Sequence, residues 1–158
     1  MARVFIGIGS NEGDRLANIS QAVQRLGSIP GIRVIQMATI YETQPVGGPP
    51  QPEFLNTVVE LDTALSPHEL LRLVKTLEQQ LGRLAAAQRW GPRRIDLDIL
   101  VYDDQVIQEP QLVIPHAQLH TRRFVLEPLA QLAPELIHPV LGQTIAELLA
   151  HLPESAPL

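Results

Sequence analysis

Residues 54–82, FLNTVVELDTALSPHELLRLVKTLEQQLG, contain a predicted strand and a predicted helix in direct succession. Phe54 to Thr63 has the composition of a strand. Ser66 then provides a helix N-cap, Pro67 suits the first helical turn, and Glu69 completes a capping box. The helix that follows ends at Gly82 and has one apolar face, which consists of Leu70, Val74, Leu77 and Leu81.

Similar elements on both sides of this segment complete the pattern of an α+β domain. Strands are predicted from Val4 to Ile8, from Arg33 to Tyr41 and from Ile95 to Tyr102. A helix ending at Gly27 lies between the first two, with apolar side chains at Leu16, Ile19, Val23 and Leu26. The order β-α-β-β-α-β is the ferredoxin-like signature, a sandwich with helices packed on a mostly antiparallel sheet.

The end of the chain is expected to add two short helices after Pro115. One is predicted to begin near Pro128. The other is predicted from Thr144, an N-cap with Glu147 three residues later. These helices would extend the sandwich without a second domain.

Length and composition indicate one domain over residues 1–158, with 45% hydrophobic residues to fill a core. The chain has no cysteine, which excludes disulfides and thiolate metal sites. The N-terminal apolar run is too short for a signal peptide or a membrane span, so we expect a cytoplasmic protein. A net charge of −5 argues against broad attraction to nucleic acid or anionic lipid.

Two segments are longer than their connections require, and we expect both to be mobile binding loops. Residues 44–53 are rich in proline and glycine, and residues 82–94 are rich in arginine. The second segment holds four of the 12 basic residues: Arg83, Arg89, Arg93 and Arg94. A site for a small anion and a solvated basic loop explain this cluster equally well.

Paired carboxylates follow the arginines on the last predicted strand. Alternate side chains of a strand share a face, so Asp96 and Asp98 point the same way, with Cα atoms about 7 Å apart. Such a pair is able to bind Mg²⁺, although most D-x-D pairs simply face water. ATP with Mg²⁺ requires carboxylates for the metal and guanidinium groups for the phosphates, and His116 and Arg122 are further candidates for that site.

Aromatic and amide side chains provide weaker signals. Phe54 and Asn56 share a strand face and are able to bind a flat heterocycle, with Phe124 as a second ring. A core phenylalanine beside an edge asparagine is the simpler interpretation of this pair. The segment from Gly7 to Glu12 lacks both the third glycine of a dinucleotide fingerprint and the lysine of a Walker loop. It is interpreted as a tight turn from strand to helix.

The sequence resembles one known family over nearly its whole length. Residues 89–100, RWGPRRIDLDIL, are similar to the signature of the 6-hydroxymethyl-7,8-dihydropterin pyrophosphokinases of folate biosynthesis. Supporting similarities are Ile8 to Asn11, Tyr41 to Thr43, Phe54 to Asn56, Pro115 with His116, Arg122 and Phe124. The resemblance implies transfer of the β,γ-pyrophosphoryl group of ATP to the hydroxymethyl group of the pterin, with release of AMP. It also implies two Mg²⁺ ions and a monomer.

The resemblance implies a role for individual residues. Asp96 and Asp98 would bind the metals and, with Arg83 and Arg93, form the catalytic set. The pterin would contact Thr43, Gln44, Val46, Phe54, Asn56, Trp90 and Phe124. ATP would contact Glu78, Arg83, Trp90, Arg93, Ile99, His116 and Arg122.

Three residues depart from the family pattern, and they bear on the catalytic rate more than on the resemblance to the family. Ala85 stands where well-known members carry another loop arginine, so phosphate neutralisation is weaker or falls to Arg94. Ala117 replaces a bulkier residue, and Phe54 stands where tyrosine is frequent. Two other functions fit the same elements. One is nucleotidyl transfer, which releases pyrophosphate, and the other is a regulatory domain that binds a small molecule without turnover.

Overall fold

Antiparallel strands form the centre of the structure, a computed structural model that describes residues 1–43, 50–82 and 94–153. The strands are β1 (Ala2–Ser10), β2 (Ile32–Met37), β3 (Tyr41–Thr43), β4 (Phe54–Thr63) and β5 (Asp96–Tyr102). They lie in the order β2-β4-β1-β5, and β3 also pairs with β4. Every named pairing in this sheet is antiparallel. This order confirms the predicted ferredoxin-like α+β fold.

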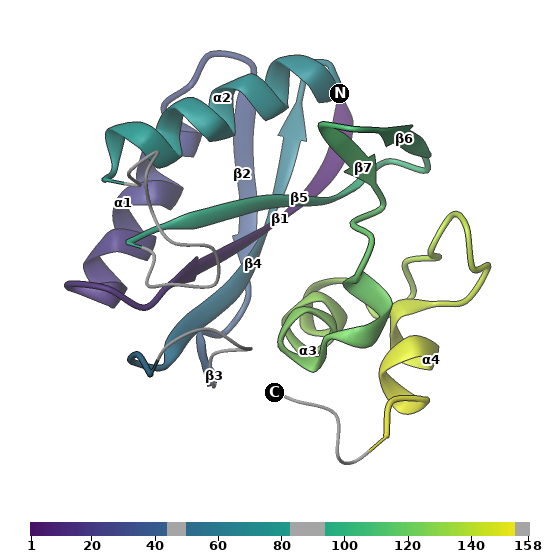
Figure 1. Ribbon diagram of the computed structural model, residues 1–158. Helices are drawn as coiled ribbons and strands as arrows, with labels where there is room; N and C mark the ends of the chain where they lie inside the picture. Colours follow the sequence, from purple (N-terminus) through teal and green to yellow (C-terminus); the bar gives the residue numbers. More distant parts are fainter. Residues whose placement is uncertain (44–49, 83–93, 154–158) are drawn as a thin grey trace.

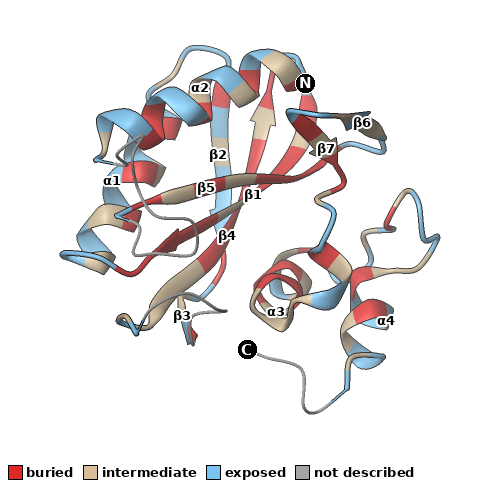
Figure 2. Ribbon diagram, viewed as in Figure 1, coloured by how far each residue is buried: buried red, intermediate tan, exposed pale blue. Residues whose placement is uncertain are grey.

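Helices cover both faces of this sheet. Helices α1 (Arg15–Gly27) and α2 (Pro67–Gln80) lie on one side, and α3 (Arg123–Leu132) and α4 (Ile145–Ala150) lie on the other (Figure 1). Most residues of β1, β4 and β5 between these helices are buried, whereas β2 at the edge is largely exposed (Figure 2). The core under α1 and α2 includes Ile6, Ile8, Ile19, Leu70, Val74 and Leu97. The core under α3 and α4 includes Phe5, Val58, Leu100, Leu126, Leu129 and Ile145.

The helix α2 begins and ends as its sequence predicts. The Ser66 side chain accepts a hydrogen bond from the Glu69 backbone, and the Glu69 carboxylate accepts one from the Ser66 backbone. This exchange satisfies two helix-end donors that otherwise lack partners. Gly82 follows the helix with a φ of +110°, a conformation that glycine adopts without strain. The Arg94 side chain lies so close to Gly82 that a Cβ there would be 2.8 Å from the Arg94 Cδ.

The prediction of one strand from Arg33 to Tyr41 is wrong, because the structure has two strands there. Ala38 still donates to the Val58 carbonyl, but the Thr39 backbone N–H donates to the Gln131 side chain of α3 at 2.7 Å. The Gln131 amide donates back to the Thr39 hydroxyl at 2.8 Å. A residue far away in sequence therefore interrupts the strand and separates β2 from β3.

The helix expected near Pro128 begins earlier, at Arg123, and Pro128 lies inside it. Proline removes one helical hydrogen bond, and the burial of Val125, Leu126 and Leu129 offsets that loss. The helix predicted from Thr144 is confirmed, with both capping-box hydrogen bonds present. Leu16 on α1 is 55% exposed, while Ile19, Ala22 and Leu26 form its buried stripe.

The sequence analysis missed three short elements between β5 and α3. Strands β6 (Ile107–Glu109) and β7 (Leu112–Ile114) form a hairpin, and a 3₁₀ helix covers Leu119–Thr121. The His68 ring on α2 contacts the Glu109 carboxylate at 2.6 Å and so ties the hairpin to the sandwich. None of the helices in the described residues is long and apolar enough to cross a membrane.

Candidate active site

The candidate active site lies on the sheet face opposite α1 and α2. Gly9 of β1 pairs with Asn56 of β4 on one side and with Asp96 of β5 on the other. Directly paired residues point to the same face of a sheet, so Asn56 and Asp96 flank Gly9 on that face. Phe54 lies two residues before Asn56, and Asp98 lies two residues after Asp96, so both side chains share this face. The register therefore brings together residues that are 40 to 87 positions apart in sequence.

Gly9 leaves room for the Asn56 side chain at the centre of this face. A Cβ at Gly9 would lie 2.8 Å from the Asn56 Oδ1, closer than real contacts allow. The interpretation of Gly7 to Glu12 as a turn is wrong for the glycines, because β1 extends to Ser10. Both glycines belong to the sheet, and the turn towards α1 begins after Ser10.

The carboxylates of β5 have the alternation that the sequence predicts. Asp96 and Asp98 are half-buried, while Leu97 and Ile99 are buried on the opposite face. Burial, together with the charges of Asp96 and Glu78, raises the pKa of Asp98 to about 7. A divalent cation would relieve this repulsion, and Mg²⁺ prefers such hard oxygen ligands. No group of three or more metal-binding side chains occurs in the described part of the chain. Mg²⁺ sites on enzymes often complete their ligands with substrate phosphates.

Glu78 of α2 supports the beginning of β5. Its side chain is almost fully buried, and one carboxylate oxygen accepts the Leu97 backbone N–H at 2.8 Å. The other oxygen accepts a hydrogen bond from the Lys75 ammonium group at 3.2 Å. Leu97 lies between the two aspartates, so this contact holds the strand segment that carries both of them. Ile99, also assigned to ATP by resemblance, has its side chain in the core under α1 and α2.

We expect Glu78→Ala to destabilise the fold and to lower activity more than Glu78→Gln does. The alanine variant leaves the buried Leu97 N–H without its acceptor, at a cost of about 1–3 kcal/mol. The glutamine variant keeps a carbonyl acceptor and removes only the charge. Urea denaturation and turnover of both variants test this, with Gln79→Ala on the exposed side of α2 as the control. Equal stability of the alanine and glutamine variants would contradict it.

His116 and Arg122 lie near the carboxylates, as the sequence analysis expected. The His116 backbone N–H donates to the carbonyl of Leu100 on β5 at 2.9 Å. Burial and the Arg122 charge lower the pKa of His116, against the opposite effect of Asp96, so the ring is mainly neutral at pH 7. The Arg122 guanidinium lies 5.4 Å from the centre of the Phe124 ring. This region therefore offers a cation and a neutral imidazole close to two acids.

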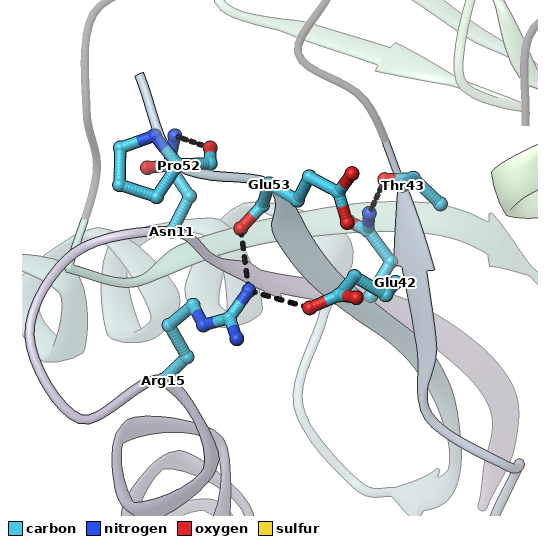
Figure 3. Close-up of polar contacts among 7 residues, drawn as sticks. Asn11, Arg15, Glu42, Thr43, Pro52 and Glu53 are labelled. Carbon is cyan, nitrogen blue, oxygen red and sulfur yellow. Dashed lines mark hydrogen bonds and ion pairs between the residues drawn. The ribbon is translucent and has the colours of Figure 1, made fainter.

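The opposite end of the face is built from β3 and β4. Thr43 pairs with Phe54, and the Asn56 amide donates a hydrogen bond to the Thr43 hydroxyl. Asn11 is a buried residue to which sequence reasoning gave no role of its own. Its side-chain amide donates to the Pro52 carbonyl at 3.1 Å (Figure 3). The same amide donates to the Gln51 side chain at 2.7 Å. A polar residue directly after a buried strand is the signal that could have pointed to it.

The remaining predicted site residues lie outside the described residues. They are Gln44, Val46, Arg83, Trp90 and Arg93. The predicted mobility of residues 44–53 and 82–94 also falls mainly on undescribed segments. The structure therefore brings together Asp96, Asp98, His116 and Arg122 at one end of the face, and Thr43, Phe54 and Asn56 at the other.

The fold and this polar face define a class of protein, the α+β domains that carry acidic, basic and amide side chains together on one sheet face. Comparison with known proteins narrows the class. The family model described as "7,8-dihydro-6-hydroxymethylpterin-pyrophosphokinase (HPPK)" matches residues 5–134. The chain belongs to this family, and its reaction is pyrophosphoryl transfer in folate biosynthesis.

Individual relatives agree with this assignment. The chain is 44% identical over 155 residues to the 2-amino-4-hydroxy-6-hydroxymethyldihydropteridine pyrophosphokinase of Methylorubrum extorquens, covering 98% of this chain and 96% of the relative. It is 44% identical over 132 residues to the enzyme of the same name from Bacillus subtilis, with 84% and 78% covered. A crystal structure of Plasmodium falciparum HPPK-DHPS matches with a TM-score of 0.75 at 18% identity. That match covers 94% of this chain and 42% of the longer one, and it supports the fold alone.

Proposed function

We propose that this chain transfers the β,γ-pyrophosphoryl group of ATP to the hydroxymethyl oxygen of 6-hydroxymethyl-7,8-dihydropterin and releases AMP. The observation that carries the proposal is the pair Asp96 and Asp98 on one strand face, beside Arg122 and His116 and across Gly9 from Asn56. We further propose that residues 1–158 act as one domain, as a monomer and in the cytoplasm.

The acidic end of the face would bind the metal and the phosphates. Asp96 and Asp98 would hold two Mg²⁺ ions, which, when bound, neutralise phosphate charge and orient the oxygens. Arg122 would donate to phosphate oxygens, and Arg83 and Arg93 are proposed to add two more guanidinium groups. His116, with its pKa lowered, would donate from a neutral ring. No side chain is assigned as general base, because this chemistry depends mainly on positioning and electrostatics.

The other end would bind the pterin. Phe54 and Phe124 would stack on its two faces, and Asn56 and Thr43 would read the donors and acceptors on its edge. The hydrogen bond from Asn56 to Thr43 supports this assignment, because it fixes the orientation of the amide. Gln44, Val46 and Trp90 are proposed to complete the pterin site, and Glu78 and the Ile99 backbone are proposed to support the nucleotide end.

Analysis of the nucleotide product tests the proposed function. The protein is incubated with ATP, Mg²⁺ and 6-hydroxymethyl-7,8-dihydropterin, and the nucleotides are separated by chromatography. We expect AMP in equal amount to the pterin diphosphate. Free pyrophosphate in place of AMP would indicate nucleotidyl transfer, and unchanged ATP would indicate a domain that only binds its ligand.

We expect Arg83→Ala and Arg93→Ala to slow turnover more than they weaken pterin binding. Guanidinium groups that meet the transferring phosphates stabilise charge in the transition state, so a loss of roughly 10²-fold in kcat is expected. Steady-state kinetics and pterin calorimetry separate the two effects. Arg33→Ala, on an exposed position of β2, is the matched control. Equal losses in kcat and pterin affinity would argue for a purely structural role.

A further inference from the structure

We propose that Arg15 is a positioning residue that ties together the two strand ends flanking residues 44–53 and so presents Thr43 and Phe54 to the pterin. This inference rests on the proposed function for the identity of the ligand. It concerns the first residue of α1, which the assignment of the site did not use.

One nitrogen of Arg15 makes both contacts. Its Nη1 atom donates to the Glu42 carboxylate at 3.0 Å and to the Glu53 backbone carbonyl at 2.8 Å (Figure 3). Glu42 directly precedes Thr43 at the end of β3, and Glu53 directly precedes Phe54 at the beginning of β4. A single guanidinium therefore bridges the two points at which the chain leaves the sheet and returns to it.

The contacts lie on the side of the sheet away from the pterin. Glu42 pairs with Leu55, and both belong to the face that α1 and α2 cover. Thr43 and Phe54 are the next positions along their strands, so their side chains point to the opposite face. Arg15 therefore acts on the site through the backbone of β3 and β4, without touching the ligand.

The position of Arg15 is unfavourable for the helix itself. Its N-cap is Asp14, and the first turn contains no acidic residue. A cation at a helix N-terminus is repelled by the helix dipole, so local helix stability does not explain an arginine there. The Arg15 side chain is only 30% exposed, because it folds against the ends of β3 and β4. The tertiary contacts offset the local cost.

Loss of this bridge should act mainly on ligand binding. A surface ion pair alone contributes little, but the bond to the Glu53 carbonyl is charge-assisted and partly buried. Without it, binding must first order the strand ends, and that cost lowers affinity. We expect Arg15→Ala to raise the Kd for 6-hydroxymethyl-7,8-dihydropterin about tenfold, the factor for about one charge-assisted hydrogen bond. The Kd for ATP and the kcat at saturating pterin should change less than about twofold.

The test combines calorimetry of each substrate with amide hydrogen exchange. Arg15→Lys is expected to recover most of the pterin affinity, because an ammonium group is able to donate to both acceptors. Glu42→Gln keeps an acceptor and is expected to weaken pterin binding only about twofold. Arg25→Ala is the matched control, since Arg25 lies in the last turn of the same helix and contacts Gln80. Thermal denaturation of each variant shows whether it is folded.

Hydrogen exchange separates this inference from the proposed function. In the ligand-free protein, the amides of Tyr41 to Thr43 and Phe54 to Asn56 should exchange faster in Arg15→Ala than in the wild type. Unchanged exchange together with unchanged pterin affinity would overturn the inference. A wild-type protein that forms no AMP would instead overturn the proposed function. In that case, amide hydrogen exchange of the β3 residues would still decide whether Arg15 orders the strand ends. Equal losses in pterin and ATP affinity would also contradict a positioning role confined to the pterin end.

Discussion

Asp98→Asn is expected to abolish pyrophosphoryl transfer and, at the same time, to stabilise the ligand-free protein at pH 8. Burial, the charge of Asp96 and the charge of Glu78 raise the pKa of Asp98 to about 7, above its ordinary value of 3.8. A raised pKa means that ionisation of Asp98 disfavours the folded state, and the amide removes that charge. Loss of a metal-binding carboxylate should lower turnover on the order of 10³-fold.

The stabilisation should depend on pH in a defined direction. Well below pH 3.8, the ordinary pKa of this side chain, Asp98 is protonated in the folded and unfolded states alike, so the variant and the wild type should be similar. As the pH rises towards 7, the unfolded wild-type chain ionises Asp98 more readily than the folded protein does, so the free energy of unfolding falls. Above pH 7, Asp98 is ionised in both states and the free energy of unfolding falls no further on its account. For this half-buried carboxylate we expect a difference of about 2 kcal/mol at pH 8.

Urea denaturation without Mg²⁺, together with the AMP assay, checks both parts of this prediction. Asp104→Asn, an exposed position on the connection after β5, should change neither stability nor turnover. Near-normal turnover of Asp98→Asn would remove Asp98 from the metal site. A less stable variant at pH 8 would mean that other contacts of Asp98 outweigh the repulsion among the carboxylates.

Gly9→Ala is expected to weaken pterin binding by roughly tenfold to a hundredfold while leaving the fold intact. The new Cβ would lie 2.8 Å from the Asn56 Oδ1, so the Asn56 amide must turn away. Turning breaks its hydrogen bond to Thr43 and removes the group proposed to read the pterin edge. The affinity for ATP should change little, because the clash points towards β4 and not towards β5.

Gly7→Ala on the same strand is the matched control for this variant. The atoms nearest to a Cβ at Gly7 would be those of the Leu100 side chain, at 3.5 Å, which is an ordinary contact distance. Both variants lose the same backbone flexibility of glycine, so a difference between them reports the contact with Asn56. Calorimetry with the pterin measures it. Equal affinities of the two variants would show that Asn56 does not set pterin binding.

Local patterns predicted the elements that carry the site. The strand from Phe54 to Thr63 has the predicted bounds, and the capping box at Ser66 sets the beginning of α2. The alternation in β5 also placed Asp96 and Asp98 on one face before any tertiary information was used. The phosphate-binding role of the arginines in residues 83–93 stays a prediction, because these arginines lie outside the described residues.

Sequence reasoning failed where distant residues compete for the backbone. Thr39 leaves the predicted strand because Gln131 takes its N–H, and the two are 92 positions apart. Gly9 appeared as part of a turn, because a glycine in a sheet and a glycine in a turn look alike in a local window. The role of Gly9 is to leave space for Asn56, and it depends on the pairing of Gly9 with Asn56 and Asp96 on the neighbouring strands, which a local window does not contain.

The sequence by itself determined the strands β1, β4 and β5 and the helices α1 and α2 of the sandwich, and it determined that two carboxylates share a strand face. Hydrophobic period and capping are local interactions, so they can be read along the chain. Only the tertiary structure decided which strands are neighbours, what lies beside each glycine and which side chains hold the strand ends. Register depends on packing between segments that are distant in the chain, and no local period encodes it.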